Sequence, residues 1–330
     1  MKKYLTGGFA GLALLVAAVA AGAQELTVYS GRGETFVGPV LALFEKETGI
    51  KLKTRYGSTA EIAALLQEEG EKSPADVFWA QDAGALGANT KLFEPLPEGL
   101  SQNLSEHFKS ETGLWIGVTG RSRSLVYSPE RVKAADMPKS VYDLTDPKWK
   151  GRIGWAPGNA SFQSFVTAMR VKDGEEAARK WVAGMVANGA KSYKNNVAIV
   201  QAVADGEIDG GLVNTYYLAR FKARDAKFPV EQTFFADGDV GNLLNVAGVG
   251  VLKTSKHKPE AVKLVEFLLS PAVQQYFAST GAEYPVTKNV IPSGALENVS
   301  DPTKASPVIA IDKLADTEGT RAILSAAGLI

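Results

Sequence analysis

The alternation of strand-like and helix-like segments near the start of the chain is the feature that most limits its fold. Three segments have the apolar, β-branched character of short strands: residues 26–30 (LTVYS), 50–55 and 76–80 (DVFWA). Between the first two, apolar residues recur at helical spacing: Val37, Val40, Leu41 and Phe44. Ser58 and Glu61 then match the capping box that begins a second helix. Strands joined by helices in this way predict a parallel α/β sheet with right-handed crossovers.

The same alternation continues through the rest of the chain. The further strands that we expect are residues 114–118, 124–127, 152–156, 209–214 and 248–252, with polar residues 120–123 separating the first two. The further helices are expected at residues 161–172, 175–187, 197–204, directly after 214, and around 261–268. No long linker divides the chain, so it should cross more than once between two α/β lobes. The expected lobes are residues 24–120 plus 245–295 and residues 121–244 plus 296–330.

Residues 1–23 have the features of a secretory signal peptide. Lys2 and Lys3 precede an uncharged run rich in Leu, Val, Ala and Gly, and Ala21-Gly22-Ala23 supplies the small-residue cleavage pattern. No Cys follows the run, so a lipid anchor is not expected. Cleavage would leave about 300 residues, which is enough for two lobes, and would place the protein outside the cytoplasm.

Composition excludes several kinds of function. The chain has no Cys and only two His, which argues against thiolate chemistry, disulfides and ordinary zinc sites. Its formal net charge is zero, so nothing in the charge points to nucleic acid or to an anionic membrane surface. No Ser/His/Asp arrangement or paired acid is evident, and we therefore do not expect an enzyme.

Tyr216 and Tyr217 follow the strand expected at residues 209–214 and begin a helix. Ligands of α/β folds lie at the carboxyl ends of strands, so both phenols are expected at a cleft. A phenol titrates near pH 10, but a hard trivalent cation can displace its proton and bind the phenolate. Packing in the core is the alternative explanation for two adjacent aromatic residues.

Seven blocks in the same order resemble the periplasmic ferric-ion-binding proteins of the iron(III) ABC importers: LTVYSGRGE (26–34), FEKETGIKL (44–52), EEGEKSPADVFWAQDAGAL (68–86), TGRSRSLVY (119–127), DPKWKGRIGWAP (146–157), GEIDGGLVNTYY (206–217) and GAEYPV (281–286). The resemblance covers nearly all of the chain after residue 23. It implies the two-lobed α/β fold of periplasmic binding proteins, with mixed, mainly parallel sheets and a hinged cleft between the lobes. It also implies that Fe(III) is the ligand and that Tyr216 and Tyr217 are its iron-binding tyrosine pair.

The chain departs from this family at two positions. Many members have an iron-binding His after the first strand and an iron-binding Glu after the third, and the corresponding residues here are Gly33 and Gln81. Gly has no side chain and a carboxamide is a weak ligand of Fe(III), so the N-terminal lobe is expected to supply no strong ligand. Tyr193 and Tyr127 are both candidates for a third ligand, and the sequence does not choose between them.

An anion is expected beside the iron, because two phenolates leave a trivalent ion with net positive charge. The resemblance implies carbonate, bicarbonate or phosphate, held at the helix that follows RIGWAP, where free backbone N–H groups favour an anion. The residues that we expect to bind it are Asn159, Ala160, Ser161, Asn195, Asn214, Arg32, Arg121 and Arg123. Asn159 and Ser161 would also serve as ordinary helix caps.

The expected function is therefore that of a monomeric, periplasmic solute-binding protein. It would capture ferric iron with a synergistic anion and deliver it to the permease of an ABC importer. The alternative is that the same fold binds another small ligand, such as a phosphonate, thiamine, a polyamine or an oxyanion.

Overall fold

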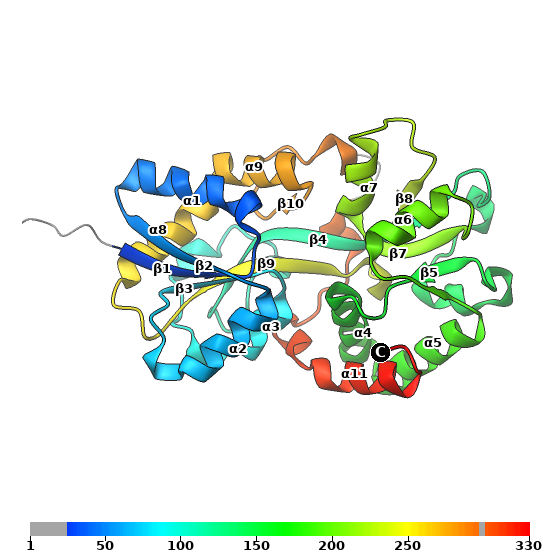
Figure 1. Ribbon diagram of the computed structural model, residues 1–330, viewed down its shortest axis with the longest axis horizontal. Coiled ribbons are helices and arrows are strands. Elements are labelled where there is room, and N and C mark those ends of the chain that lie inside the picture. The colour runs from blue at the N-terminus through cyan, green and yellow to red at the C-terminus, as the bar shows by residue number, and fades with distance from the viewer. Residues whose placement is uncertain (1–24, 297–300) are drawn as a thin grey trace, which may run out of the picture.

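The computed structural model describes residues 25–296 and 301–330, which form two α/β lobes (Figure 1). The predicted signal peptide, residues 1–23, lies outside these residues. One mixed sheet runs through both lobes, with the strand order β2-β1-β3-β9-β4-β7-β5-β6. Within the described part of the chain, no helix combines the length and the apolar character that spanning a membrane requires.

The first lobe contains three parallel strands and the helices that connect and cover them. Its elements are β1 (Glu25–Ser30), α1 (Glu34–Thr48), β2 (Lys51–Tyr56), α2 (Thr59–Glu69), β3 (Val77–Ala80), α3 (Ala83–Ala88), α8 (Lys258–Leu268), α9 (Pro271–Gly281) and β10 (Tyr284–Pro285). β1 pairs in parallel with both β2 and β3, as the alternating pattern predicts. The predicted capping box of Ser58 and Glu61 is confirmed at the start of α2.

The second lobe repeats this plan with different elements. They are β5 (Ile153–Trp155), α4 (Ala160–Asp173), α5 (Glu175–Ala187), β6 (Lys191–Ser192), α6 (Asn196–Ala204), β7 (Gly210–Asn214), α7 (Thr215–Lys222), β8 (Glu231–Thr233), α10 (Pro302–Ala305) and α11 (Thr317–Ala326). β5 pairs in parallel with β6 and β7. The three helices predicted at 161–172, 175–187 and 197–204 are confirmed to within one residue at each end.

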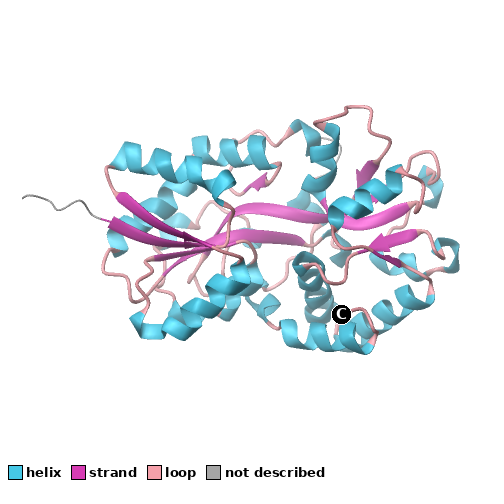
Figure 2. Cartoon of the chain, viewed as in Figure 1, coloured by secondary structure: helices cyan, strands magenta, loops and turns pink. Residues whose placement is uncertain are grey.

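Two long strands, β4 (Ile116–Tyr127) and β9 (Leu244–Val251), run from one lobe into the other (Figure 2). β4 pairs with β9 as far as Ser122 and with β7 from Arg123 onward, in both cases antiparallel. The prediction of two strands separated by polar residues 120–123 is wrong, because these residues lie inside one continuous strand. Their polar groups are buried, and that of Ser122 finds a partner in the second lobe: its hydroxyl donates to the carbonyl of Asn242 at 2.7 Å.

β4 is irregular near its start, in the first lobe. Its register with β9 shifts between Gly117 and Thr119, as at a β-bulge. The buried side chain of Gln274, in α9, donates to the carbonyl of Val118 at 2.8 Å and accepts from the N–H of Val286 at 2.9 Å. This side chain therefore supplies the irregular residue with a hydrogen-bond partner and ties it to the segment after β10.

The C-terminal segment contacts both lobes. The carboxylate of Asp312 accepts hydrogen bonds from the indole of Trp115 and from the hydroxyl of Ser110, the latter at 3.0 Å. Farther along, α11 packs against α4, where Thr167 and Thr320 share a hydrogen bond of 2.7 Å. The lobe boundaries expected from the sequence stay predictions.

Candidate functional site

A cavity of about 200 Å³ lies where strand ends of the two lobes meet. Arg32 and Gly33 follow β1, Gln81 follows β3 and Tyr216 follows β7, and all four residues line the cavity. Because β1 is parallel to β3, their carboxyl ends lie at the same edge of the sheet. The remaining lining residues are Phe36, Arg220, Thr280, Gly281 and Glu283. The structure thus brings Gly33, Gln81 and Tyr216 together, as the sequence predicts.

The two tyrosines stack at the first turn of α7. Their ring centroids are 4.4 Å apart with an angle of 31° between the planes. Tyr216 is buried and lines the cavity, whereas Tyr217 is half-buried and packs against the apolar cluster beneath α6 and α7. The guanidinium of Arg220, one helical turn later, lies 4.8 Å from the ring centre of Tyr216 and 5.7 Å from that of Tyr217. Two phenols therefore lie beside a cation on one face of a helix.

Opposing effects act on the acidity of Tyr217. Burial and the neighbouring Tyr216 together raise the pKa of Tyr217 to about 12. The positive charges of Arg220 and Arg123 act in the opposite direction. Proton loss at neutral pH is thus unfavourable in the free protein and requires a strong cation to drive it.

Arg123 is a buried cation beside the tyrosines. Its Nη1 donates to the side-chain oxygens of Asn214 at 3.1 Å and Asn196 at 3.3 Å. Its Nε and Nη2 have no hydrogen-bond partner among the residues described here, and no carboxylate there pairs with it. Burial lowers the pKa of Arg123, the nearby phenols act in the opposite direction, and the result is a pKa of about 10. A full positive charge in this position is stabilised if the phenols ionise or an anion binds.

Most of the expected anion-binding residues of the second lobe form one network with Arg123. Asn214 donates to the hydroxyl of Ser161 at 3.1 Å, and that hydroxyl donates to the side chain of Asn159 at 2.6 Å. Asn159 also caps α4 by accepting from the N–H of Ser161, as predicted. Ala160 is the first residue of α4, next to this network. Asn195 is apart from it, because its side chain caps α6.

Glu283 and two arginines form a second polar centre at the cavity. Both carboxylate oxygens of Glu283 accept from Nη2 of Arg32, at 2.8 and 3.0 Å, and one also accepts from the hydroxyl of Thr119. Burial alone would raise the pKa of Glu283, but the charges of Arg32 and Arg121 and these hydrogen bonds lower it. Arg121 is buried as well, and within residues 25–296 and 301–330 its Nε and Nη1 lack a hydrogen-bond partner.

The two candidates for a third tyrosine ligand lie away from the cavity. Tyr127 pairs with Gly210 at the start of β7, whereas the cavity is at the end of that strand. The ring of Tyr193 packs over Gly154, and its hydroxyl donates to Glu207 at 3.2 Å. Neither residue lines the cavity, and the identity of a third protein ligand stays open.

Sequence reasoning missed two charged residues that line the cavity, Arg220 and Glu283. Arg220 could have been found, because it lies four positions after Tyr216 and so shares its face of the helix. Glu283 lies inside the block GAEYPV, but its partner Arg32 is 251 positions away and no local pattern connects them.

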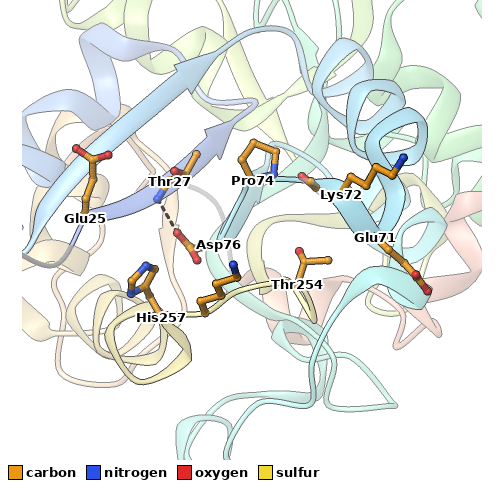
Figure 3. Close-up of a pocket in the computed structure, with 10 residues that line it drawn as sticks. Glu25, Thr27, Glu71, Lys72, Pro74, Asp76, Thr254 and His257 are labelled. Atoms are coloured by element: carbon orange, nitrogen blue, oxygen red, sulfur yellow. Dashed lines mark hydrogen bonds between the residues drawn. The ribbon is translucent and has the colours of Figure 1, made fainter.

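A larger hollow of about 730 Å³ lies at the opposite, amino ends of β1 and β3 (Figure 3). The carboxylate of Asp76 lines it but already accepts from the N–H of Thr27 at 2.8 Å and from the hydroxyl of Ser255 at 2.6 Å. Ligands of α/β folds bind at the other ends of the strands. The part of the chain that the structure describes also has no group of three or more His, Cys, Asp or Glu side chains placed to hold a metal. The cavity at the tyrosines is therefore the stronger candidate.

Comparison with known proteins extends these observations. The family described as bacterial extracellular solute-binding protein matches residues 72–314. The major ferric iron-binding protein of Neisseria meningitidis is 35% identical over 330 residues, with 96% of this chain and 98% of the relative covered. Iron uptake protein A1 of Synechocystis is 37% identical over 281 residues, covering 81% of this chain and 77% of the relative. Among solved structures, iron-bound HitA of Pseudomonas aeruginosa has a TM-score of 0.81 at 33% identity, covering 93% of this chain and 100% of HitA.

Two α/β lobes that share crossing strands and enclose a polar cavity define a two-lobed binding protein for a small solute. The matched residues include the tyrosine pair and parts of both lobes. The chain belongs to the bacterial extracellular solute-binding proteins and, among them, to the family of periplasmic ferric-ion-binding proteins.

Proposed function

We propose that this protein captures ferric iron in the cavity between its lobes, with the phenolates of Tyr216 and Tyr217 as ligands. The observation that carries the proposal is the stacked phenol pair beside Arg123, a buried cation that has no acidic partner within the described residues. Ionised phenols give Arg123 the negatively charged partners that it otherwise lacks. A trivalent cation takes the place of the protons that the phenols lose. The relatives named for ferric iron and iron uptake support the same ligand.

A synergistic anion, carbonate or phosphate, completes the proposed site. Arg32, Arg121, Arg123 and Arg220 lie at or next to the cavity, with Glu283 as the one carboxylate among its lining residues. This excess of positive charge repels a metal cation unless an anion enters with it. Guanidinium groups with unused N–H donors bind oxyanions well, in keeping with this role.

The test is a visible spectrum of the purified protein with Fe(III) and bicarbonate, together with the iron content per chain. We expect the absorption band of tyrosinate bound to Fe(III) and one iron per chain. Tyr216→Phe and Tyr217→Phe should each weaken iron binding by more than about 100-fold, because each removes a charged ligand and only one oxygen atom. Tyr193→Phe is the matched control, since its phenol lies outside the cavity and should not change the colour. If both single variants at the pair keep full colour and affinity, the site is assigned wrongly.

A second candidate ligand is an oxyanion or phosphonate without iron. The arginines around the cavity favour it, because they outnumber the acidic side chains there. Binding of phosphate or a phosphonate with high affinity, together with a colourless protein that retains no iron, would support this candidate over the first.

The family implies the protein's setting. We infer that it acts in the periplasm as a carrier without enzymatic activity and passes its iron to the permease of an ABC importer. A monomer suffices for this role, because both lobes of one chain enclose the cavity.

A further inference from the structure

Glu283 occupies an unusual place for an acidic residue near a proposed cation site. Its carboxylate lines the cavity, yet it is almost fully buried and binds Arg32 and Thr119 rather than facing outward. All its close partners are hydrogen-bond donors from the first lobe or from the crossing strand β4. The Glu283 carboxylate is therefore placed like an anion bound by the protein, and not like a side chain that is free to bind a metal.

Arg32 is only partly used by this contact. Nη2 donates to both oxygens of Glu283, whereas Nε and Nη1 make no hydrogen bond within the described chain. The backbone just before Arg32 packs tightly against Thr59, because a Cβ atom at Gly31 would lie 2.2 Å from the hydroxyl oxygen of Thr59. The guanidinium also lies 5.0 Å from the ring centre of Phe36. Arg32 is thus held at the cavity with donors left for a second anion.

We propose that Glu283 is an internal counter-anion, a positioning residue that occupies Arg32 and thereby sets how strongly the cleft binds an external anion. Its negative charge repels a carbonate or phosphate that approaches Arg32 and Arg121, and its oxygens take one of the donors that such an anion would use. The same charge offsets part of the repulsion between the arginines and a metal cation. This role deepens the proposed function of the cavity and rests on it for the iron measurements alone.

The variant Glu283→Gln tests the proposal, with inorganic phosphate as the probe of the iron-free protein. The amide preserves the shape of the side chain but removes the competing charge. We expect phosphate to bind Glu283→Gln about tenfold more tightly than it binds the original protein. The reason is that the variant no longer has a negative charge competing with phosphate for the guanidinium. The matched control is Glu34→Gln, which makes the same change of charge at the start of α1 without contact to Arg32. It should leave phosphate affinity within about twofold, because an exposed charge is screened.

Iron binding supplies the second readout. In Glu283→Gln, iron affinity without added anion should fall, and the ratio of iron affinities with and without saturating phosphate should rise about tenfold, since the coupling between two ligands is reciprocal. If Glu283 were itself an iron ligand, iron affinity would fall equally in both conditions and the ratio would not change. If it were only structural, the thermal midpoint would fall while phosphate affinity stayed the same. Either result overturns the proposal.

A double variant keeps the test decisive if the single variant does not fold. Arg32→Gln with Glu283→Gln removes the ion pair without leaving a buried charge. Its phosphate affinity should be equal to or lower than that of the original protein, because the competitor and its arginine are both gone. Tighter phosphate binding by the double variant would show that Glu283 does not weaken phosphate binding by occupying Arg32. The phosphate measurements need no iron, so they stand even if the protein proves not to bind it.

Discussion

Two cavity residues of the first lobe offer no ionisable ligand opposite Tyr216. Gln81 lines the cavity with a neutral amide, and Gly33 has no side chain. Space is not the reason for the glycine, because a Cβ atom there would have no heavy atom within 4 Å. The backbone is also ordinary, with φ −66° and ψ 135°. Gly33 could therefore be replaced by a residue with a side chain without strain.

We expect that adding a ligand at either position tightens iron binding. Gln81→Glu supplies a carboxylate, which is a far better ligand for Fe(III) than an amide, and Gly33→His supplies an imidazole. Each should raise iron affinity about tenfold and reduce its dependence on bicarbonate, as the gain of one ligand or charged neighbour commonly does. Gln81→Ala, by comparison, should lower affinity much less than Tyr216→Phe. Loss of binding in Gln81→Ala as complete as in the tyrosine variant would show that the first lobe is a primary ligand donor.

The site could be predicted from the sequence only where its residues carry a local signal. Tyr216 and Tyr217 follow a strand directly, so their place at a cleft could be inferred from the pattern of elements alone. Glu283 and Arg32 are joined by the fold across 251 positions, and neither is distinctive in its own segment. Long-range ion pairs of this kind depend on how helices and strands pack together. The spacing of apolar residues in the sequence does not reveal this packing.

At the scale of elements, the outer helices and strands were predictable and the central strands were not. α5 and α6 have clear helical spacing, because one face of each is buried. β4 is buried along nearly its full length, including polar residues 120–123, so its sequence lacks the alternation of a half-exposed strand. The polar run in the middle of β4 therefore predicts a break, although the strand continues through it.

Gln274 should contribute strongly to stability through the irregular part of β4. Gln274→Ala leaves the carbonyls of Val118 and Leu268 and the N–H of Val286 without their partner in a buried place. We expect a loss of about 2–4 kcal/mol in the free energy of unfolding, measured in urea. The neighbouring Gln275→Ala is the control, because Gln275 is half-exposed and its hydrogen bonds lie at the surface. Its loss should be below about 1 kcal/mol, and equal losses in the two variants would exclude the role of Gln274.

The whole molecule should release iron as the pH falls. Both phenols must lose a proton to bind the metal, and burial raises the pKa of Tyr217 to about 12, so protons compete with iron throughout the neutral range. The logarithm of the iron affinity should fall by about two for each unit of pH, one for each phenol. Competition with a chelator at several pH values measures this slope.

The tyrosine variants provide the control for this pH dependence. In Tyr217→Phe the slope should fall by about one, because one proton fewer is displaced. Iron retention that does not change down to about pH 4 would contradict coordination by phenolates, since phenols are protonated throughout that range.

The pairing of β3 with β9 also determines when the molecule can fold. Ala80 pairs with Gly248, so the sheet of the first lobe stays incomplete until β9 has been synthesised. Ribosomes add about 5–20 residues per second, which leaves the early strands without this partner for roughly ten seconds or more. We expect a chain ordered in this way to remain without its completed sheet for most of its synthesis. A circular permutant that places β9 before β1 would lose this delay and should fold while still on the ribosome.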